Sequence, residues 1–562
     1  MSSSSLSSGA NKGDVNHNVA DIIDGHSGDG SVKNEKLNNV VSMTEEQIGD
    51  SQNVITTILS PSGREIKVTG DVDEAMKLAL KSQGITVTPE EDRKLVRKID
   101  LYMFPLMCIL YAIQFMDKVS NGSAAVMGLR TDLKMHGNQY SWVGSAFYFG
   151  YLFFNMGPGQ FIFQKSPYLA KTLAVFVVIW GMFLALHAAP SVNYGSFIFL
   201  RVLLGCAESM VTPTFTMITA QYWKKEEQFM RVCLWFGFNG LGGIWANSLA
   251  YGLYIRQDSY SIEGWRVLFV VTGCITIFVG FLIYFHLPDD PSKAWFLNER
   301  EKLMVVERIR DNQQGFGNHH IKWYQVKEAF MDVRTWLYFI FSVGSNIPNG
   351  GLTNFMSILI KNDFGYSTKD SLLMSMPTGA VELVGCPLLG YLSVLAARKH
   401  IPVLKNRLTW GIFASVLSVI ATCMLAFADD SKQARLAGAY LLYIAPLSFI
   451  CVLSNISANT LGYTKKWTVS SINLVSYSAS NLAGPQTFIE SQAPSYKGAK
   501  IAMIVCYSAC VVTLSLLYFI NDRENKRRDR IAAERGTDDK VMENLEFADL
   551  TDFENPHFRY TL

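Results

Sequence analysis

Five charged side chains stand inside long apolar stretches of the sequence: Asp117, Lys118, Arg201, Glu208 and Glu382. A charge at the centre of a membrane helix costs roughly 2.5–3.5 kcal/mol, so a charge that persists there faces a cavity or a partner. A carboxyl group in such a cavity can take up and release a proton, and the cations can bind a carboxylate. These residue types therefore predict the joint binding of protons and an anion.

Their spacing supports a shared site. Arg201 and Glu208 are seven residues apart, which puts them on one helix face about 10 Å apart along the axis. Asp117 and Lys118 belong to another stretch and are expected at a comparable depth. An anion that neutralised the cations would make the acids bind protons more readily, and such cooperative binding is the basis of symport. The competing interpretation is that Asp117, Lys118 and Arg201 are rim charges that pair with one another or with lipid headgroups.

Proton coupling is accordingly predicted for Asp117, Glu208 and Glu382. Glu382 has no basic residue within two helical turns, so a polar packing role stays equally open for it. Amide and phenol groups in the second half could bind a substrate with several polar groups, because an amide donates and accepts at once. Hydrogen bonding between helices is the alternative for each of them. These candidates are Asn346, Asn349, Asn354, Asn455, Asn459, Tyr477 and Asn481.

The elements that carry these residues are apolar segments long enough to cross a membrane, which takes roughly 20 residues. The chain has 562 residues, 49% hydrophobic and only 17% charged, and its net charge of +2 argues against a nucleic-acid binder. We predict an all-α integral membrane protein with twelve transmembrane helices in two six-helix halves. The predicted spans are 101–120, 138–160, 172–190, 195–220, 230–254, 265–286, 335–360, 370–396, 407–428, 435–460, 468–490 and 499–521.

The organisation that follows has six parts. They are a disordered cytoplasmic tail (1–87), a membrane-surface helix (88–100), an N-terminal half (101–286), a cytoplasmic link (287–334), a C-terminal half (335–521) and a second cytoplasmic tail (522–562). Thr88-Pro89-Glu90-Glu91 predicts the start of the surface helix, with a cap residue, a proline and acids in the first turn.

Lysine and arginine gather in the loops that lie inside if the N-terminus is inside, so both tails are predicted to be cytoplasmic. The tail lysines Lys33 and Lys36 are candidate ubiquitylation sites. Asn121-Gly122-Ser123 forms a glycosylation sequon on the predicted outer side. The nine cysteines form no CxxC motif, so neither a zinc site nor a cofactor is expected, and no catalytic constellation indicates an enzyme.

Several segments of the sequence are similar to those of a known protein family. They are Phe104-Pro105-Leu106, Met116-Asp117-Lys118, Ser145–Tyr151, Arg201–Glu208 with Pro213, and Asn481–Gln486. In these segments the chain resembles the anion:cation symporter family of the major facilitator superfamily, from about residue 88 to 530. Within that family it is most similar to fungal members, in Gln139–Trp142, Ile347–Gly351, Lys465–Asn473 and the C-terminal Asp549–Pro556.

The resemblance implies a monomeric plasma-membrane protein that imports small carboxylated nitrogen compounds with protons by alternating access. Allantoate, ureidosuccinate and small dipeptides are the implied substrates. The resemblance assigns substrate binding or proton coupling to Asp117, Lys118, Arg201 and Glu208, and adds Tyr151. Some members have arginine at position 118, and an arginine can bind a carboxylate in a bidentate fashion. The lysine in this sequence puts bidentate binding at that position in doubt. A carrier of a vitamin acid such as nicotinate or pantothenate, and a nutrient sensor that transports nothing, are the alternatives.

Overall fold

The computed structural model describes residues 56–59, 65–68, 87–166, 168–309, 322–428, 430–535, 550–555 and 557–562. Two short strands, β1 (Thr56–Leu59) and β2 (Glu65–Val68), form an antiparallel hairpin in which Ile58 lies opposite Ile66. The rest of the predicted disordered tail before residue 87 lies outside the described residues, and so do Lys33 and Lys36.

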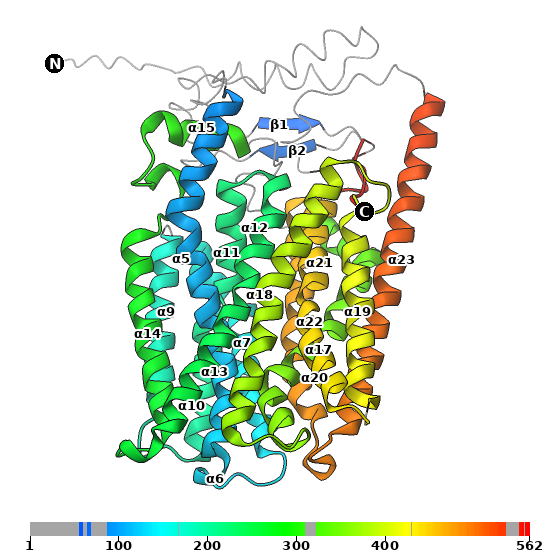
Figure 1. Cartoon of the computed structure of the whole chain (residues 1–562). Helices are drawn as coiled ribbons and strands as arrows, with labels where there is room; N and C mark the ends of the chain where they lie inside the picture. The colour runs from blue at the N-terminus through cyan, green and yellow to red at the C-terminus, as the bar shows by residue number, and fades with distance from the viewer. Residues whose placement is uncertain are drawn as a thin grey trace, which may run out of the picture. The chain divides into compact units, whose positions relative to one another are not determined.

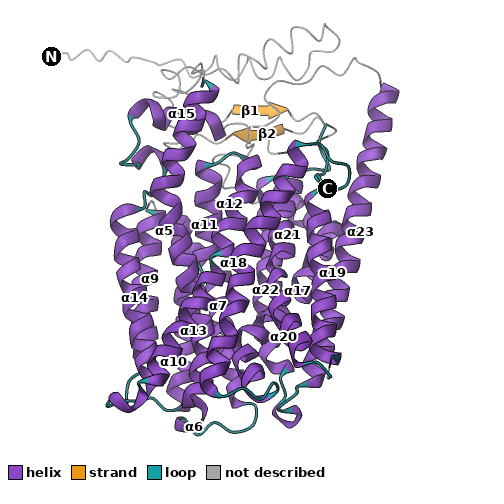
Figure 2. Ribbon diagram, in the orientation of Figure 1, coloured by secondary structure: helices purple, strands orange, loops and turns teal. Residues whose placement is uncertain are grey.

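The first half of the chain is helical, with short connections (Figures 1 and 2). Its elements are α5 (Pro89–Ala124), a π-helical turn (Ala125–Leu129), α6 (Arg130–Asp132), α7 (Gln139–Met156), α8 (Pro158–Lys165), α9 (Leu169–Leu186), α10 (Tyr194–Glu208), α11 (Val211–Tyr222), α12 (Lys225–Gly237), α13 (Asn239–Ile255), a 3₁₀ turn (Gln257–Ser259) and α14 (Gly264–His286).

The link and the second half are helical as well. Their elements are a 3₁₀ turn (Pro291–Lys293), α15 (Glu299–Ile309), α16 (Trp323–Met331), α17 (Val333–Asn362), α18 (Thr368–Arg398), α19 (Arg407–Phe427), α20 (Lys432–Leu441), a 3₁₀ turn (Leu442–Ile444), α21 (Pro446–Asn459), α22 (Tyr463–Ala483), two 3₁₀ turns (Gly484–Thr487 and Glu490–Gln492) and α23 (Lys497–Arg535).

Local sequence explains where these helices begin and break. The Thr88 hydroxyl accepts a hydrogen bond from the Glu91 N–H, and the Glu91 carboxylate accepts one from the Thr88 N–H, which is the predicted helix start. The predicted surface helix and first span are one continuous helix, α5. The predicted fourth and tenth spans are each interrupted. Pro213 and Pro446 lie just beyond these breaks, and a proline ring clashes with the carbonyl four residues before it.

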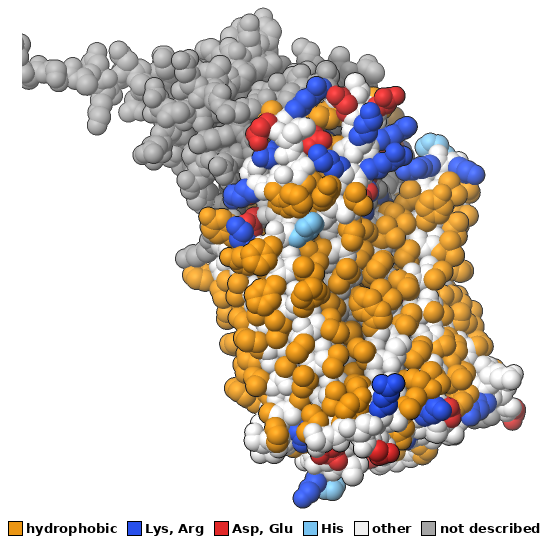
Figure 3. Space-filling model, turned by 60° about the vertical axis from the view of Figure 1, so that its left-hand side comes forward, with side chains coloured by type: hydrophobic (Ala, Val, Ile, Leu, Met, Phe, Trp, Pro, Cys, Tyr) orange, Lys and Arg blue, Asp and Glu red, His pale blue; other side chains and the backbone are white. Residues whose placement is uncertain are grey.

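Among the described residues, eight helices are long and apolar enough to cross a membrane. The other four predicted spans, over α7, α12–α13, α17 and α22, are helical but more polar. Polar residues of α17 and α22 line the cavity described below, which explains their lower hydropathy. On the face drawn in Figure 3, hydrophobic side chains cover the middle and charged side chains gather towards the two ends, as expected for a membrane belt.

Two glycines allow α7 and α10 to lie against each other with almost no space between their backbones. A Cβ atom on Gly150 would lie 1.9 Å from the Val202 carbonyl oxygen, and one on Gly205 would lie 1.9 Å from that of Phe147. Small residues allow this close approach between membrane helices. The contact fixes the position of α10, which carries Arg201 and Glu208.

Candidate functional site

Asp117 of α5 and Arg201 of α10 form a buried charge network. Arg201 Nη1 lies 3.8 Å from Asp117 Oδ1, and Trp180 Nε1 donates to Asp117 Oδ2 at 2.8 Å. Arg201 Nη2 also donates to Asn121 Oδ1 at 3.0 Å, and Asn121 Nδ2 donates to Asn354 Oδ1. Asp117 is 1% exposed and Arg201 is 3% exposed. Pairing of Asp117 and Arg201 with lipid headgroups is therefore excluded, because both lie inside the protein; they pair with each other.

Lys118 and Glu208 form the second pair. Lys118 Nζ donates to Glu208 Oε1, and the Glu208 side chain is fully buried. The other carboxylate oxygen of Glu208 has no hydrogen-bond partner within the described residues. The two acids and two bases thus lie between α5 and α10 as two separate pairs, and of the four only Lys118 lines the cavity described next.

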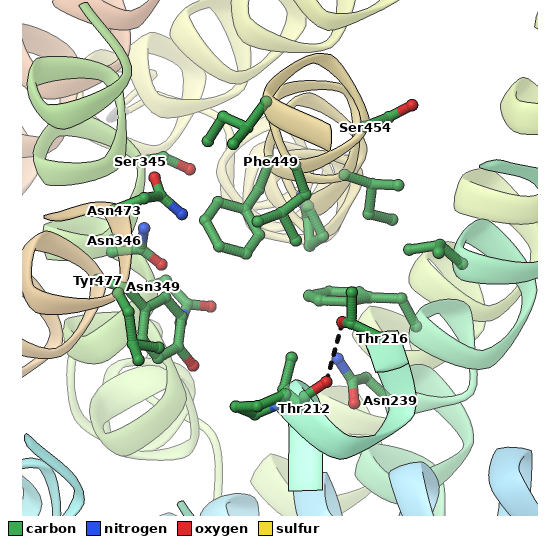
Figure 4. Close-up of a pocket in the computed structure, with 18 of the residues that line it drawn as sticks. Thr212, Thr216, Asn239, Ser345, Asn346, Asn349, Phe449, Ser454, Asn473 and Tyr477 are labelled. Carbon is green, nitrogen blue, oxygen red and sulfur yellow. Dashed lines mark hydrogen bonds between the residues drawn. The ribbon is translucent and has the colours of Figure 1, made fainter. Parts of the chain in front are cut away.

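A cavity of about 430 Å³ lies next to this second pair. Lys118 and Glu382 line it, as do Tyr151 and Tyr477. Figure 4 shows Ser345, Asn346, Asn349, Asn473 and Tyr477 along one wall, with Thr212, Thr216 and Asn239 across from them. The cavity lining therefore combines three cations, Lys118, Arg407 and Lys466, with one acid, Glu382, and many groups that can donate or accept hydrogen bonds.

The lining of the cavity extends, within the described residues, to one end of the bundle. Its lining extends to Met217 near the end of α11, to Ser457 near the end of α21 and to Trp467 near the start of α22. This is the end that the distribution of basic residues predicts to be cytoplasmic.

The opposite end is closed by contacts between the two halves. Arg130 Nη2 donates to both carboxylate oxygens of Glu490 at 3.1 Å, and Ser145 Oγ donates to the Leu482 carbonyl at 2.7 Å. Phe355 and Phe488 both belong to the second half, and their rings stack beside these contacts with centroids 4.4 Å apart. Tyr140 of α7, in the first half, packs on the Phe355 ring.

The predicted site residues divide into three groups. Those that line the cavity are Lys118, Tyr151, Asn346, Asn349, Tyr477 and Glu382. Those buried beside it are Asp117, Arg201, Glu208, Asn354 and Asn481. Those away from it are Asn455 and Asn459.

Asn455 and Asn459 hold the end of the chain instead of facing the cavity. Both donate from Nδ2 to the Thr561 carbonyl, at 3.0 and 2.8 Å, and Asn459 Oδ1 accepts from the Thr561 N–H. The Arg407 N–H donates to the Leu562 oxygen. Their prediction as substrate-binding residues is therefore wrong: their hydrogen-bonding capacity is used by the C-terminal segment.

The C-terminal segment, residues 550–562 without residue 556, is built into the second half at the end to which the cavity extends. Lys465 Nζ lies 2.7 Å from Asp552 Oδ1, 2.9 Å from Glu328 Oε1 and 3.2 Å from Asp332 Oδ2. The Tyr560 hydroxyl donates to Asp552 Oδ2 at 2.7 Å. A buried lysine surrounded by three acids ties the segment to α16 and α22, and this accounts for Asp552 of the C-terminal motif.

At the same end of the first half, α15 is held by ion pairs. Lys98 Nζ donates to Glu301 Oε2 at 2.7 Å, and Arg308 lies 2.7 Å from Asp92 and 2.6 Å from Glu227. Burial tends to raise the pKa of the Glu301 carboxyl, but the hydrogen bonds from Lys98 and the Asn298 N–H outweigh it and hold that pKa below its ordinary value.

Sequence reasoning missed several cavity residues, namely Gln114, Tyr148, Asn239, Ser345 and Asn473. Asn473 lies within the segment Lys465–Asn473 that carried the resemblance, but nothing in the sequence distinguishes it from the other polar residues of α22. The sequon asparagine Asn121 is 1% exposed and bonded to Arg201, so the structure leaves no room for a glycan there.

Comparison with protein families gives a match to the Major Facilitator Superfamily over residues 107–485. The chain belongs to this superfamily. As a member, it is a membrane transporter of a small molecule and not an enzyme, as the sequence predicted. The all-helical facilitator fold is likewise confirmed.

This facilitator is 69% identical to the allantoate permease of Saccharomyces cerevisiae over 530 residues. The alignment covers 94% of this chain and 97% of that one. It is 46% identical to an uncharacterized transporter of Schizosaccharomyces pombe, over 94% of this chain and 99% of that one. Among solved structures, a proton:xylose symporter bound to 6-bromo-6-deoxy-D-glucose aligns with a TM-score of 0.55 at 14% identity, over 76% of this chain and 96% of that one. This last likeness concerns the fold alone.

Proposed function

We propose that the protein imports allantoate together with protons. The observation that carries this proposal is the cavity cation Lys118 paired with the fully buried acid Glu208, in a chain 69% identical to an allantoate permease. Allantoate has one carboxylate and two ureido groups, and the cavity offers cations, Lys118 among them, and a wall of amide and hydroxyl groups.

The Lys118–Glu208 pair supplies a means of coupling. A substrate carboxylate that enters the cavity competes with Glu208 for Lys118. A buried carboxylate that has lost its counter-ion is costly, so Glu208 takes up a proton when the substrate binds. When the substrate leaves, Lys118 pairs with Glu208 again and the proton is released. The intact pair in a cavity open at the predicted cytoplasmic end is what this cycle requires after substrate release.

Glu382 is a second proposed proton-binding group. It is 1% exposed and lines the cavity, and its Oε2 has no hydrogen-bond partner within the described residues. Asn239 lies beside it across the interface of the two halves. The proposed roles of Asp117 and Arg201 are different: they form a separate pair towards the closed end and would exchange partners when that end opens.

Alternating access requires the closed end to open. The ion pair between Arg130 and Glu490 and the Ser145 hydrogen bond to Leu482 are the proposed outer gate. Closing the opposite end would bring α11 and α12 towards α21 and α22.

The setting we propose is the plasma membrane, with both termini cytoplasmic and the protein acting as a monomer. The basic loops predicted to lie inside support this orientation. Ureidosuccinate and small dipeptides are proposed as further substrates because they share a carboxylate and amide-type groups. Ubiquitylation of Lys33 and Lys36 is proposed as a means of removal from the surface.

The test is uptake of radiolabelled allantoate by cells that lack their own allantoate uptake, with and without this chain. We expect saturable uptake that excess unlabelled allantoate abolishes and that nicotinate or pantothenate leaves intact. Lys118→Gln is expected to lose uptake, whereas Lys369→Gln, an exposed lysine at the start of α18, is the matched control. If the protein reaches the surface in normal amounts but gives no uptake, the nutrient-sensor alternative is favoured. If only nicotinate or pantothenate competes, the alternative of a vitamin-acid carrier is favoured.

A further inference from the structure

The loop between α18 and α19 is basic and has no acid to balance it. Its cations Arg398, Lys399 and Lys405 are exposed, and within the described residues none of them forms an ion pair. The sequence from 383 to 428 contains no aspartate or glutamate. By contrast, Lys98 at the same end of the bundle is held by an acid. The loop is therefore a local excess of positive charge.

The helix ends account for only part of this charge. Arg398 and Lys399 stand at the C-terminal end of α18, where a cation is favourable. Lys405 stands two residues before the first residue of α19, where the helix end is itself positive and a cation is unfavourable. The neighbouring helix α23 carries Asp522 near this end, but Asp522 pairs with Lys526. The positive charge at the start of α19 therefore favours an anion from outside the chain.

Exposed apolar side chains lie between these cations. Ile401, Val403 and Leu404 are 38%, 57% and 42% exposed. Their loop is held in place by α19, because Thr409 Oγ1 donates to the Val403 carbonyl at 2.9 Å and Trp410 Nε1 donates to the Leu404 carbonyl at 2.8 Å. An ordered loop that combines cations with exposed apolar side chains suits the boundary of a bilayer, where charged headgroups meet acyl chains.

Val403 is held in a backbone conformation that valine rarely adopts. Its φ is +67°, in the left-handed region, where a β-branched residue is strained. Asparagine or glycine would adopt this conformation at a lower cost. A strained residue whose apolar side chain stays exposed gains little from the fold itself, and this points to a contact outside the protein.

The loop continues the exposed apolar surfaces of the two helices that it joins. On α18, Lys399 follows the exposed residues Leu388 and Leu392 by about three and two turns, so the three share one face. On α19, Phe413 is 49% exposed, and its ring meets that of Trp410 edge-on. The cations thus lie where these helices leave the hydrocarbon region and reach the level of the headgroups.

We propose that the α18–α19 loop binds an anionic phospholipid: its three cations hold the headgroup, and its three exposed apolar side chains lie among the acyl chains. Clustered basic residues beside a membrane helix attract anionic lipids. A soluble acidic partner would balance the charge but would leave the apolar side chains without acyl chains to contact. The inference is independent of which substrate is carried. It agrees with the proposed orientation, because anionic lipids concentrate in the cytoplasmic leaflet.

The test is the composition of the lipid that stays with the protein. The full chain is reconstituted into phosphatidylcholine vesicles with about 20% phosphatidylserine and extracted in mild detergent, and its bound phospholipid is measured by mass spectrometry. We expect phosphatidylserine to be enriched at least about threefold over its share in the vesicles. Extraction at about 0.5 M salt is expected to lower this enrichment, because salt screens exposed charges. Arg398→Gln/Lys399→Gln/Lys405→Gln is expected to lose more than about half of it.

Two further variants separate lipid binding from stability. Lys134→Gln/Lys369→Gln/Lys497→Gln removes three exposed cations from the opposite end of the bundle and is the matched control, which is expected to keep the enrichment. Val403→Asn relieves the backbone strain and removes an apolar side chain, so it is expected to melt no lower than the wild type in detergent and yet to retain less phosphatidylserine.

A soluble competitor tests the apolar part of the contact. Glycerophosphoserine has the headgroup without acyl chains, and we expect it not to displace the bound lipid. The inference would be overturned by a wild type without enrichment, by enrichment that salt leaves unchanged, or by equal retention in the loop variant and the wild type. Equal loss in the control variant, full retention by Val403→Asn, or displacement by glycerophosphoserine would overturn it as well.

Discussion

Replacing Glu208 by glutamine removes one member of a buried ion pair and keeps the shape of the side chain. The Glu208 side chain has no exposed surface, and Lys118 is its ion-pair partner. Breaking such a pair on one side costs about 3–5 kcal/mol, because the remaining charge stays buried without a counter-ion. We therefore expect Glu208→Gln to be less stable than the wild type in detergent, and Lys118→Met/Glu208→Gln to regain much of that loss.

The same change separates binding from coupling. In Glu208→Gln, Lys118 has lost its ion-pair partner and a substrate carboxylate can take that place, so saturating allantoate is expected to raise the melting temperature of the variant more than that of the wild type. The side chain can no longer take up or release a proton. Exchange of labelled for unlabelled allantoate is expected to persist, while accumulation against a gradient is expected to disappear.

The size of that loss can be stated. One pH unit of gradient stores about 1.4 kcal/mol for each proton, which corresponds to a tenfold concentration ratio. With one proton for each allantoate, wild-type vesicles with a gradient of one unit should approach a tenfold ratio, and Glu208→Gln should stay near one. Glu299→Gln, an exposed acid of α15, is the control. Full accumulation by Glu208→Gln, or a double variant no more stable than the single one, would refute the reasoning.

Three other predictions follow from the described contacts. Deleting Thr561 and Leu562 removes four hydrogen bonds to α19 and α21, each worth about 1 kcal/mol, so the melting temperature should fall by several degrees; an unchanged value would contradict the docking of the segment. The pKa of Glu301 is lowered in the folded state, so its stabilising pair with Lys98 is present above about pH 4.3 and is lost as the pH falls through the lowered value; thermal melts below pH 5 should depend less on pH in Glu301→Gln than in the wild type. Glycosidase treatment should produce the same mobility change in the wild type and in Asn121→Gln, because Asn121 is buried, and a difference between them would show that it carries a glycan.

The meeting of α5 and α10 could be predicted because burial in a membrane helix makes a charge conspicuous. Asp117, Lys118, Arg201 and Glu208 stand out from apolar neighbours, and the seven-residue spacing puts the last two on one face. The pairing of Lys118 with Glu208 could not be predicted, since it depends on how deeply α10 sits against α7, and that is set by backbone contact at Gly205.

The polar residues of the second half were harder to assign. Asn455 and Asn473 look alike in the sequence: each is an asparagine within a predicted span. Their positions differ because Asn455 is bonded to a residue more than one hundred positions away, Thr561, whereas Asn473 lines the cavity. Long-range docking of a tail leaves no periodic signal, so the sequence offered no means of separating the two.

The same limit applies to the sequon. Its three residues are a valid acceptor pattern, but the pattern carries no information on burial. The position of Asn121 beside Arg201 follows from the tertiary packing of α5, and so the structure decides a question that the motif alone leaves open.

The most direct test of the coupling proposed for Lys118 and Glu208 is proton movement on addition of allantoate. Purified protein is reconstituted into vesicles with equal pH on both sides, a pH-sensitive dye inside and a potassium conductance to dissipate voltage. We predict that external allantoate acidifies the interior of wild-type vesicles, and that Glu208→Gln vesicles take up allantoate down its gradient without acidification. Allantoate uptake without acidification in the wild type, or equal acidification in both proteins, would contradict the account.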